Sequence, residues 1–130
     1  VPEARYVAYD IYTDLMPFLQ GSLDLLGLRG EALALDVLGN LPALEAVDCA
    51  LLLKAIPCLE QLDPMAGARL LRQLPARHML VSFPVASLGG RRKGMPAHYE
   101  QHLSALLAGE NWRVQRFAFE TELAFLIHKG

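Results

Sequence analysis

The sequence predicts an α/β fold built on a mostly parallel sheet. Segments rich in β-formers alternate with helix-patterned segments along the 130 residues, which is typical of βαβ units. The predicted strands are nearly continuous apolar runs, which fits a sheet covered on both faces. The length allows one domain with a substantial core.

The first half of the chain predicts two strands around one helix. Residues 5–11 are rich in β-formers and end on an acid, so they are expected to form a strand. Thr13 or Asp14 can cap a helix that runs to Leu26. Gly27 and Gly30 punctuate its end. Residues 31–37 are a second apolar strand with Asp36 near its end, and residues 39–44 form a turn.

The second half predicts two further buried strands and a closing hairpin. Proline and glycine mark the boundaries here. The expected segments are a strand at 46–53, a bend at Pro57, a helix from Asp63 to Leu74 with Pro64 in its first turn, a strand at 78–83, a helix from Pro96 to Ala108 stopped by Gly109, and antiparallel strands at 112–119 and 122–127.

The loop between the fourth strand and the following helix is rich in glycine and cations. It contains Ser87, Arg91, Arg92 and Lys93, and exposed backbone amides beside positive charge suit an anion. Residues 64–99 carry six cations and no acid, and such a one-sided field favours a polyanionic partner. The alternative is a solvated, charged turn.

Polar residues follow the predicted strands at the end where ligands bind in such sheets. Asp10 at a strand end can accept both hydroxyls of a ribose, and Asp36 can accept from an adenine amino group. Lys54 can hold a phosphate or a base edge. The alternatives are that the two acids cap the following segments, and that Lys54 is a solvated strand end.

Other chemistries find little support in the sequence. Cys49 and Cys58 are predicted to be buried, reduced thiols of a cytoplasmic protein, and no apolar run reaches the roughly 20 residues of a membrane span. His98 and His102 have helical spacing but no third ligand, so no metal is expected. Neither a Walker loop nor a nucleophile elbow occurs. The aromatic residues of the late strand are expected in the core: Trp112, Phe117 and Phe119.

Several motifs together resemble one enzyme family. They are Lys54-Ala-Ile-Pro-Cys-Leu-Glu60, Val81-Ser-Phe-Pro84, Ser87-Leu-Gly-Gly-Arg91, Lys93-Gly-Met95, Tyr99 and Thr121-Glu-Leu123. In this order and spacing they resemble the aminoglycoside-resistance methyltransferases of 16S ribosomal RNA. These enzymes transfer a methyl group from S-adenosyl-L-methionine to N-7 of a decoding-site guanine. The resemblance covers essentially the whole chain.

The resemblance implies a Rossmann-like methyltransferase sheet and a set of site residues. The implied cofactor-binding residues are Asp10, Ile11, Asp36, Val37 and Leu53. Lys54 is the implied catalytic residue at the target nucleotide, and the implied RNA-binding residues are Ser87, Arg91, Arg92 and Lys93. The implied partner is 16S rRNA in the small (30S) ribosomal subunit, and we expect a monomer. Glu122 lies in a family motif and receives no chemical role.

The chain departs from the family pattern at three places. Val85-Ala86 stands where the family usually has Thr-Arg, and Arg92 stands where it usually has Gly. The first strand and its Gly-rich loop are expected to be missing, so residues 1–130 are predicted to be the C-terminal part of the catalytic domain. Another possibility is a non-catalytic RNA-binding module on a decayed methyltransferase fold.

Overall fold

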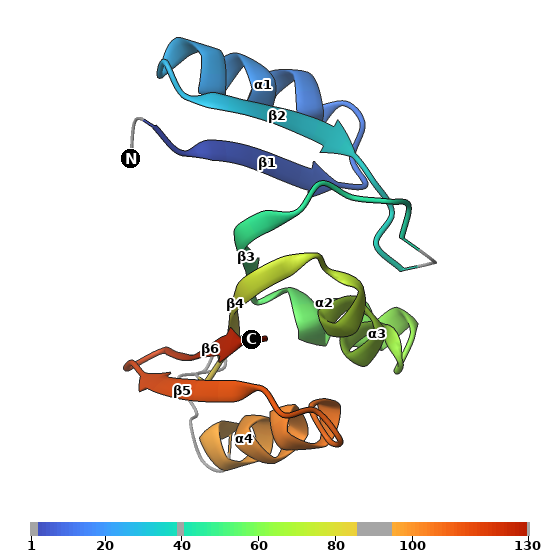
Figure 1. Cartoon of the computed structure of the whole chain (residues 1–130), viewed down its shortest axis with the longest axis vertical. Coiled ribbons are helices and arrows are strands. Elements are labelled where there is room, and N and C mark those ends of the chain that lie inside the picture. The colour runs from blue at the N-terminus through green and yellow to red at the C-terminus, as the bar shows by residue number, and fades with distance from the viewer. Residues whose placement is uncertain (1–2, 39–40, 86–94, 130) are drawn as a thin grey trace. The chain divides into compact units, whose positions relative to one another are not determined.

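The computed structural model describes residues 3–38, 41–85 and 95–129 of the chain. The chain divides into two compact units, Val1–Leu41 and Pro42–Gly130. Each unit is described separately below, and Figure 1 shows the order of their elements.

The first unit is a single βαβ motif. Strand β1 (Arg5–Asp10) and strand β2 (Arg29–Ala34) pair in parallel, and helix α1 (Leu15–Leu25) connects them, as the sequence predicts. The side chain of Gln20 ties the helix to β2, because its amide donates to Gly30 O at 3.0 Å and accepts from Ala32 N at 3.0 Å. Asp14 occupies the N-cap position of α1 without a side-chain hydrogen bond to the helix.

The second strand lies two to three residues earlier than predicted. Gly27, with φ of 70°, ends the helical segment as expected, but Gly30 is part of β2 rather than of the helix end. A Cβ at Gly30 would lie 2.3 Å from the carbonyl oxygen of Tyr6. Glycine is therefore required by the close approach of two strands, a need that local sequence pattern does not reveal.

The second unit contains a mixed four-stranded sheet. Its strands are β3 (Val47–Leu53), β4 (Ala76–Pro84), β5 (Arg113–Ala118) and β6 (Glu122–His128), in the order β3-β4-β6-β5. The pair β3-β4 is parallel, whereas β6 runs antiparallel to both β4 and β5. The predicted antiparallel hairpin at the end of the chain is confirmed.

Three helices accompany this sheet, and one of them was not predicted. Helix α2 (Ala55–Leu62) includes Pro57, where we expected only a bend. Proline is tolerated in a first helical turn because the amides there have no intrahelical acceptor. Helix α3 (Ala66–Gln73) begins after a turn in which the Asp63 carboxylate accepts from Met65 N at 3.0 Å. Helix α4 (Met95–Leu106) precedes Gly109, whose φ is 88°.

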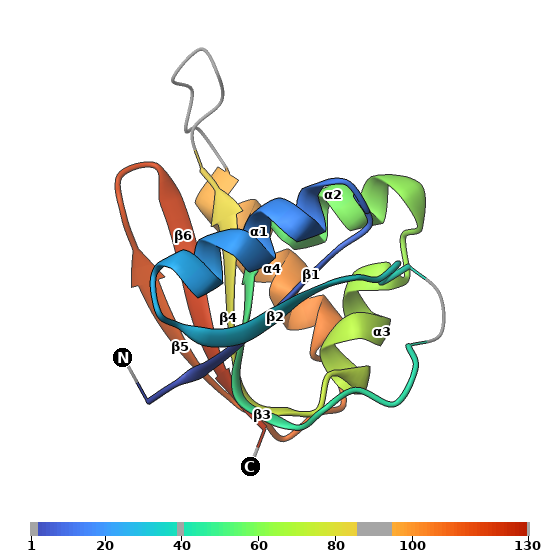
Figure 2. The same cartoon turned by 90° about the horizontal axis from the view of Figure 1, so that it is seen from above.

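The helices of the second unit lie on one side of its sheet (Figure 2). The sheet face toward them forms the core, where Met79, Val81, Phe83 and Ile127 are fully buried. The other face is partly exposed: Leu51, Leu53 and Phe117 are at 64%, 56% and 42% exposure, whereas Ser82 and Ala124 on the same face are buried. Helices of this unit cover one face of its sheet (Figure 2), and coverage of both faces stays a prediction.

Two predictions of burial are wrong. Cys49 lies on the partly exposed face of β3 and Cys58 lies on α2, and both are free and exposed rather than buried. Phe117 and Phe119 are likewise exposed, because β5 is the outermost strand of its sheet. None of the described helices is long and apolar enough to cross a membrane.

Candidate functional site

Asp10 and Asp36 lie at the same end of two paired strands in the first unit. Asp10 is the last residue of β1, and its carbonyl oxygen accepts from Leu35 N at 2.8 Å, one residue beyond the end of β2. Parallel pairing thus places both acids at the carboxyl ends of neighbouring strands, with Asp36 two residues beyond Ala34, the register partner of Asp10. Ligands bind at this end of open α/β sheets.

Both carboxylates are oriented by the backbone that follows them. Asp10 Oδ1 accepts from Ile11 N at 2.7 Å, and Asp36 Oδ1 accepts from Leu38 N at 2.9 Å. The capping role considered from the sequence is therefore present in both. A carboxylate has acceptor sites on two oxygens, so this bond fixes its direction and leaves acceptor capacity for a ligand.

The neighbouring apolar residues offer a surface beside these acids. Ile11 is 57% exposed, and Val37 is partly exposed just after Asp36. An apolar surface with adjacent carboxylates suits a nucleoside, whose base is flat and whose ribose hydroxyls donate hydrogen bonds. The described residues around Asp10 and Asp36 therefore fit the adenosine part of a cofactor.

Lys54 lies at the carboxyl end of β3 in the second unit. Its backbone is left-handed, with φ of 56°, and it is the one non-glycine residue with positive φ in the described ranges. It precedes the first residue of α2, and its amide donates to both the carbonyl oxygen and Oγ of Ser82 at 3.1 Å. Strained backbone that surrounding bonds hold in place occurs preferentially at functional sites.

Two residues that sequence reasoning left without a role join Lys54. Ser82 is 2% exposed, and its hydroxyl donates to Glu122 Oε1 at 2.8 Å. The Lys54 Nζ atom lies 4.0 Å from the same carboxylate oxygen. Ser82 is a polar residue within an otherwise apolar strand, which is a detectable signal, whereas the position of Glu122 depends on the pairing of β4 with β6.

The predicted RNA-binding residues Ser87, Arg91, Arg92 and Lys93 lie outside the described residues. Two other cations of the basic stretch form ion pairs with acids from outside it. Arg69 lies 2.7 Å from Asp63, and Arg72 lies 3.0 Å from Glu110. These pairs reduce the one-sided positive field that composition alone suggested.

The His98–His102 pair lies on α4, where His98 is exposed and His102 is partly exposed. His102 Nε2 lies 2.6 Å from Glu60 Oε1, and the ring of His98 stacks on that of His102 at 6.2 Å. His102 therefore links α4 to α2. In the parts of the chain that the structure covers, no cluster of three His, Cys, Asp or Glu side chains could hold a metal ion.

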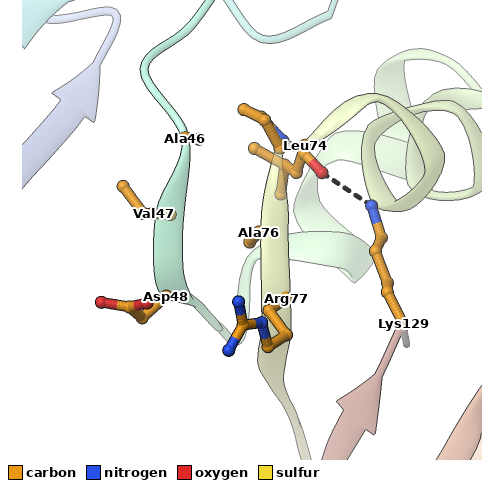
Figure 3. Close-up of a pocket in the computed structure, with 8 residues that line it drawn as sticks. Ala46, Val47, Asp48, Leu74, Ala76, Arg77 and Lys129 are labelled. Atoms are coloured by element: carbon orange, nitrogen blue, oxygen red, sulfur yellow. Dashed lines mark hydrogen bonds between the residues drawn. The ribbon is translucent and has the colours of Figure 1, made fainter.

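A separate open pocket of about 490 Å³ lies at the opposite ends of β3 and β4 (Figure 3). Asp48, Arg77 and Lys129 contribute its charged groups. Lys129 donates to the carbonyl oxygen of Leu74 at 2.7 Å, and burial lowers the pKa of its ammonium group. Because Lys54 lies at the carboxyl end of β3, this pocket is not part of the Lys54 site.

Comparisons with known proteins show which family the chain belongs to. A family model described as ribosomal RNA methyltransferase (FmrO) matches residues 1–126. The chain is 35% identical over 127 residues to a 16S rRNA (guanine(1405)-N(7))-methyltransferase of Micromonospora rosea, covering 98% of this chain and 46% of the relative. A Serratia marcescens protein of the same name is 43% identical over 95 residues, covering 73% of this chain and 38% of the relative.

Solved structures show the same fold. The 16S rRNA methyltransferase RmtF in complex with S-adenosyl-L-homocysteine superposes with a TM-score of 0.84 at 33% identity, covering 95% of this chain and 47% of RmtF. An rRNA methylase from Escherichia coli superposes with a TM-score of 0.78 at 29% identity, covering 95% of this chain and 48% of the methylase chain. The chain spans about half the length of these relatives. By its match over residues 1–126, the chain belongs to the ribosomal RNA methyltransferase (FmrO) family.

Proposed function

We propose that residues 1–130 form the C-terminal part of a methyltransferase catalytic domain. The whole protein would methylate N-7 of a decoding-site guanine in 16S rRNA and so confer aminoglycoside resistance. The observation that carries the proposal is the family match over residues 1–126, together with Asp10, Asp36 and Lys54 each at or just beyond the carboxyl end of a parallel strand.

We propose that the cofactor is S-adenosyl-L-methionine. In this proposal Asp10 accepts from the ribose hydroxyls and Asp36 from the adenine amino group. Ile11, Val37 and Leu53 supply apolar contacts. RmtF, which is 33% identical to this chain, was solved with S-adenosyl-L-homocysteine, the product of this cofactor. When bound, the cofactor supplies an electrophilic methyl group.

The protein's remaining task in this reaction is to place the target nitrogen. N-7 of guanine already has a lone pair, so no strong base is needed. Correct positioning of the nucleotide is therefore the main contribution of the protein to the rate of transfer. We assign Lys54 to the target nucleotide, because its ammonium group can bind a phosphate or the O6 edge of guanine. Ser87, Arg91, Arg92 and Lys93 are assigned to the RNA backbone.

The substrate is proposed to be 16S rRNA within the 30S subunit, methylated in the cytoplasm by a monomer.

The sheet edges support a larger catalytic domain in the whole protein. Among the described residues, β1 pairs only with β2, and the outer edge of β3 has no partner strand. Unpaired backbone groups cost about 1–3 kcal/mol each when buried. A strand of the whole protein that pairs with one of these edges would satisfy its backbone groups, and a Gly-rich turn after that strand would allow a close approach to the cofactor.

Methyl transfer to purified 30S subunits tests the proposal. Label from S-adenosyl-L-methionine would be followed with the whole protein, with the 130-residue chain and with Asp10→Asn in the whole protein. Asp24→Asn on α1 is a matched control. We expect transfer by the whole protein, strong loss in Asp10→Asn, no effect of the control, and no transfer by the 130-residue chain.

Two outcomes would contradict the proposal in different ways. A whole protein that binds 30S subunits but transfers no methyl group would support the non-catalytic RNA-binding module instead. Turnover by the 130-residue chain equal to that of the whole protein would show that residues 1–130 need no further strand or Gly-rich turn.

A further inference from the structure

The hydroxyl of Ser82 connects three elements at the carboxyl end of the second unit's sheet. Ser82 lies near the end of β4, Lys54 lies between β3 and α2, and Glu122 is the first residue of β6. Ser82 is the one buried polar or charged side chain in the described parts of the chain. Such a group is costly to bury unless its hydrogen bonds are made, and here they are made only to these two residues.

The direction of both hydrogen bonds follows from their chemistry. The Lys54 amide can only donate, so Ser82 Oγ must accept from it at 3.1 Å. The hydroxyl proton is then available to Glu122 Oε1 at 2.8 Å, which accepts it as an ionised carboxylate does. The hydroxyl therefore fixes the Lys54 backbone on one side and the Glu122 carboxylate on the other.

The anchored carboxylate also faces the Lys54 ammonium group. Lys54 Nζ lies 4.0 Å from Glu122 Oε1, the same oxygen that accepts from Ser82. The Lys54 side chain is 60% exposed and that of Glu122 is 33% exposed, so both charged groups remain accessible to solvent. Ser82 thus holds the Lys54 backbone by a hydrogen bond and holds the carboxylate that lies within ion-pair distance of the Lys54 ammonium group.

We propose that Ser82 is a positioning residue for Lys54, acting through the Lys54 amide and through Glu122. This inference rests on the proposed function, in which Lys54 contacts the target nucleotide. Ser82 itself is too buried to touch RNA, so it acts on the rate by holding the Lys54 ammonium group in place. Small displacements of a positioning group reduce the rate strongly, whereas they affect substrate binding less.

A double-mutant cycle in the whole protein tests this role. Ser82→Ala, Lys54→Ala and the double variant would be compared in methyl transfer to 30S subunits, with Ser104→Ala on the exposed side of α4 as the matched control. We expect Ser82→Ala to lower kcat about tenfold with little change in KM, which is the signature of a lost transition-state interaction. The double variant should be no slower than Lys54→Ala alone.

The outcomes separate this inference from the proposed function. If Lys54→Ala transfers methyl as fast as the parent protein, the assigned role of Lys54 is wrong. If Lys54→Ala is slow but Ser82→Ala is normal, or if the two losses multiply in the double variant, Ser82 does not act through Lys54. Thermal melting of each variant would check folding. Should Ser82→Ala unfold, Glu122→Gln is the second variant, because it keeps an acceptor for the Ser82 hydroxyl and removes the charge facing Lys54. Combined with Lys54→Ala, it should be no slower than Lys54→Ala alone. Losses that multiply would overturn the inference.

Discussion

Replacing Phe83 by alanine should destabilise the second unit more than any exposed aromatic substitution in the same sheet. Phe83 is fully buried on β4. Its ring stacks on Tyr99 of α4 at 4.7 Å and meets Phe125 of β6 edge-on at 6.1 Å. The side chain therefore joins the helix layer to two strands.

The magnitude follows from burial, cavity formation and the two aromatic contacts. Burying a phenylalanine contributes about 1.5–3 kcal/mol, and each aromatic pair adds roughly 0.5–1.5 kcal/mol. Phe83→Ala should thus lower the free energy of unfolding by about 3–5 kcal/mol, the usual range for a buried phenylalanine. With a urea m-value of roughly 2 kcal/mol/M, the unfolding midpoint falls by about 2 M.

Urea unfolding followed by the fluorescence of Trp112, the sole tryptophan, measures this effect. Phe117→Ala is the matched control, because it removes the same side chain from the exposed face of the same sheet, where Phe117 is 42% exposed. Its cost should be about 1 kcal/mol or less. Equal midpoints for the two variants would refute the assignment of one sheet face to the core and the other to the surface.

Three further predictions concern the strand contact, the pH dependence and the RNA. Gly30→Ala should disrupt the β1-β2 pairing, since its Cβ would lie 2.3 Å from a backbone oxygen, whereas Gly21→Ala in open space on α1 should stabilise by up to ~1 kcal/mol; circular dichroism melting compares them. Burial, with His78 and Arg113 nearby, lowers the pKa of His128 below 6.5. Near pH 6.5 the unfolded state then binds more protons than the folded state. The urea midpoint should therefore fall as the pH drops through 6.5, and His128→Gln should reduce that fall. In the whole protein, Arg91→Ala and Lys93→Ala should each weaken 30S binding and reduce its salt slope by roughly one unit; affinities equal to the parent at every salt concentration would leave the loop a solvated turn.

Local pattern was sufficient to predict most of the elements. Alternating strand and helix segments gave the βαβ motif of the first unit and the parallel β3-β4 pair, because hydrophobic periodicity directly reflects which side chains face a core. The two-residue connection at Glu120-Thr121 gave the closing hairpin. Gly27 and Gly109 ended their helices as expected, since both have positive φ.

The failures arose where a contact distant in sequence decides the local structure. Helix α2 was missed because proline usually breaks a helix, but position three of α2 needs no donor. Gly30 was assigned to a helix end, although its need for glycine comes from Tyr6 on the paired strand. The exposure of Cys49 and Phe117 depends on which sheet face the helices cover, and that choice is not encoded in the residues themselves.

The candidate site divides in the same way. Motifs spread over the chain were enough to identify the family. Hydrophobic runs that end at polar residues were enough to place Asp10, Asp36 and Lys54 at or just beyond the carboxyl ends of parallel strands. The meeting of Ser82 and Glu122 at Lys54, in contrast, depends on contacts between strands distant in sequence. Ser82 and Glu122 are 40 residues apart, and an antiparallel register between β4 and β6 is what brings a buried hydroxyl within hydrogen-bond distance of that carboxylate.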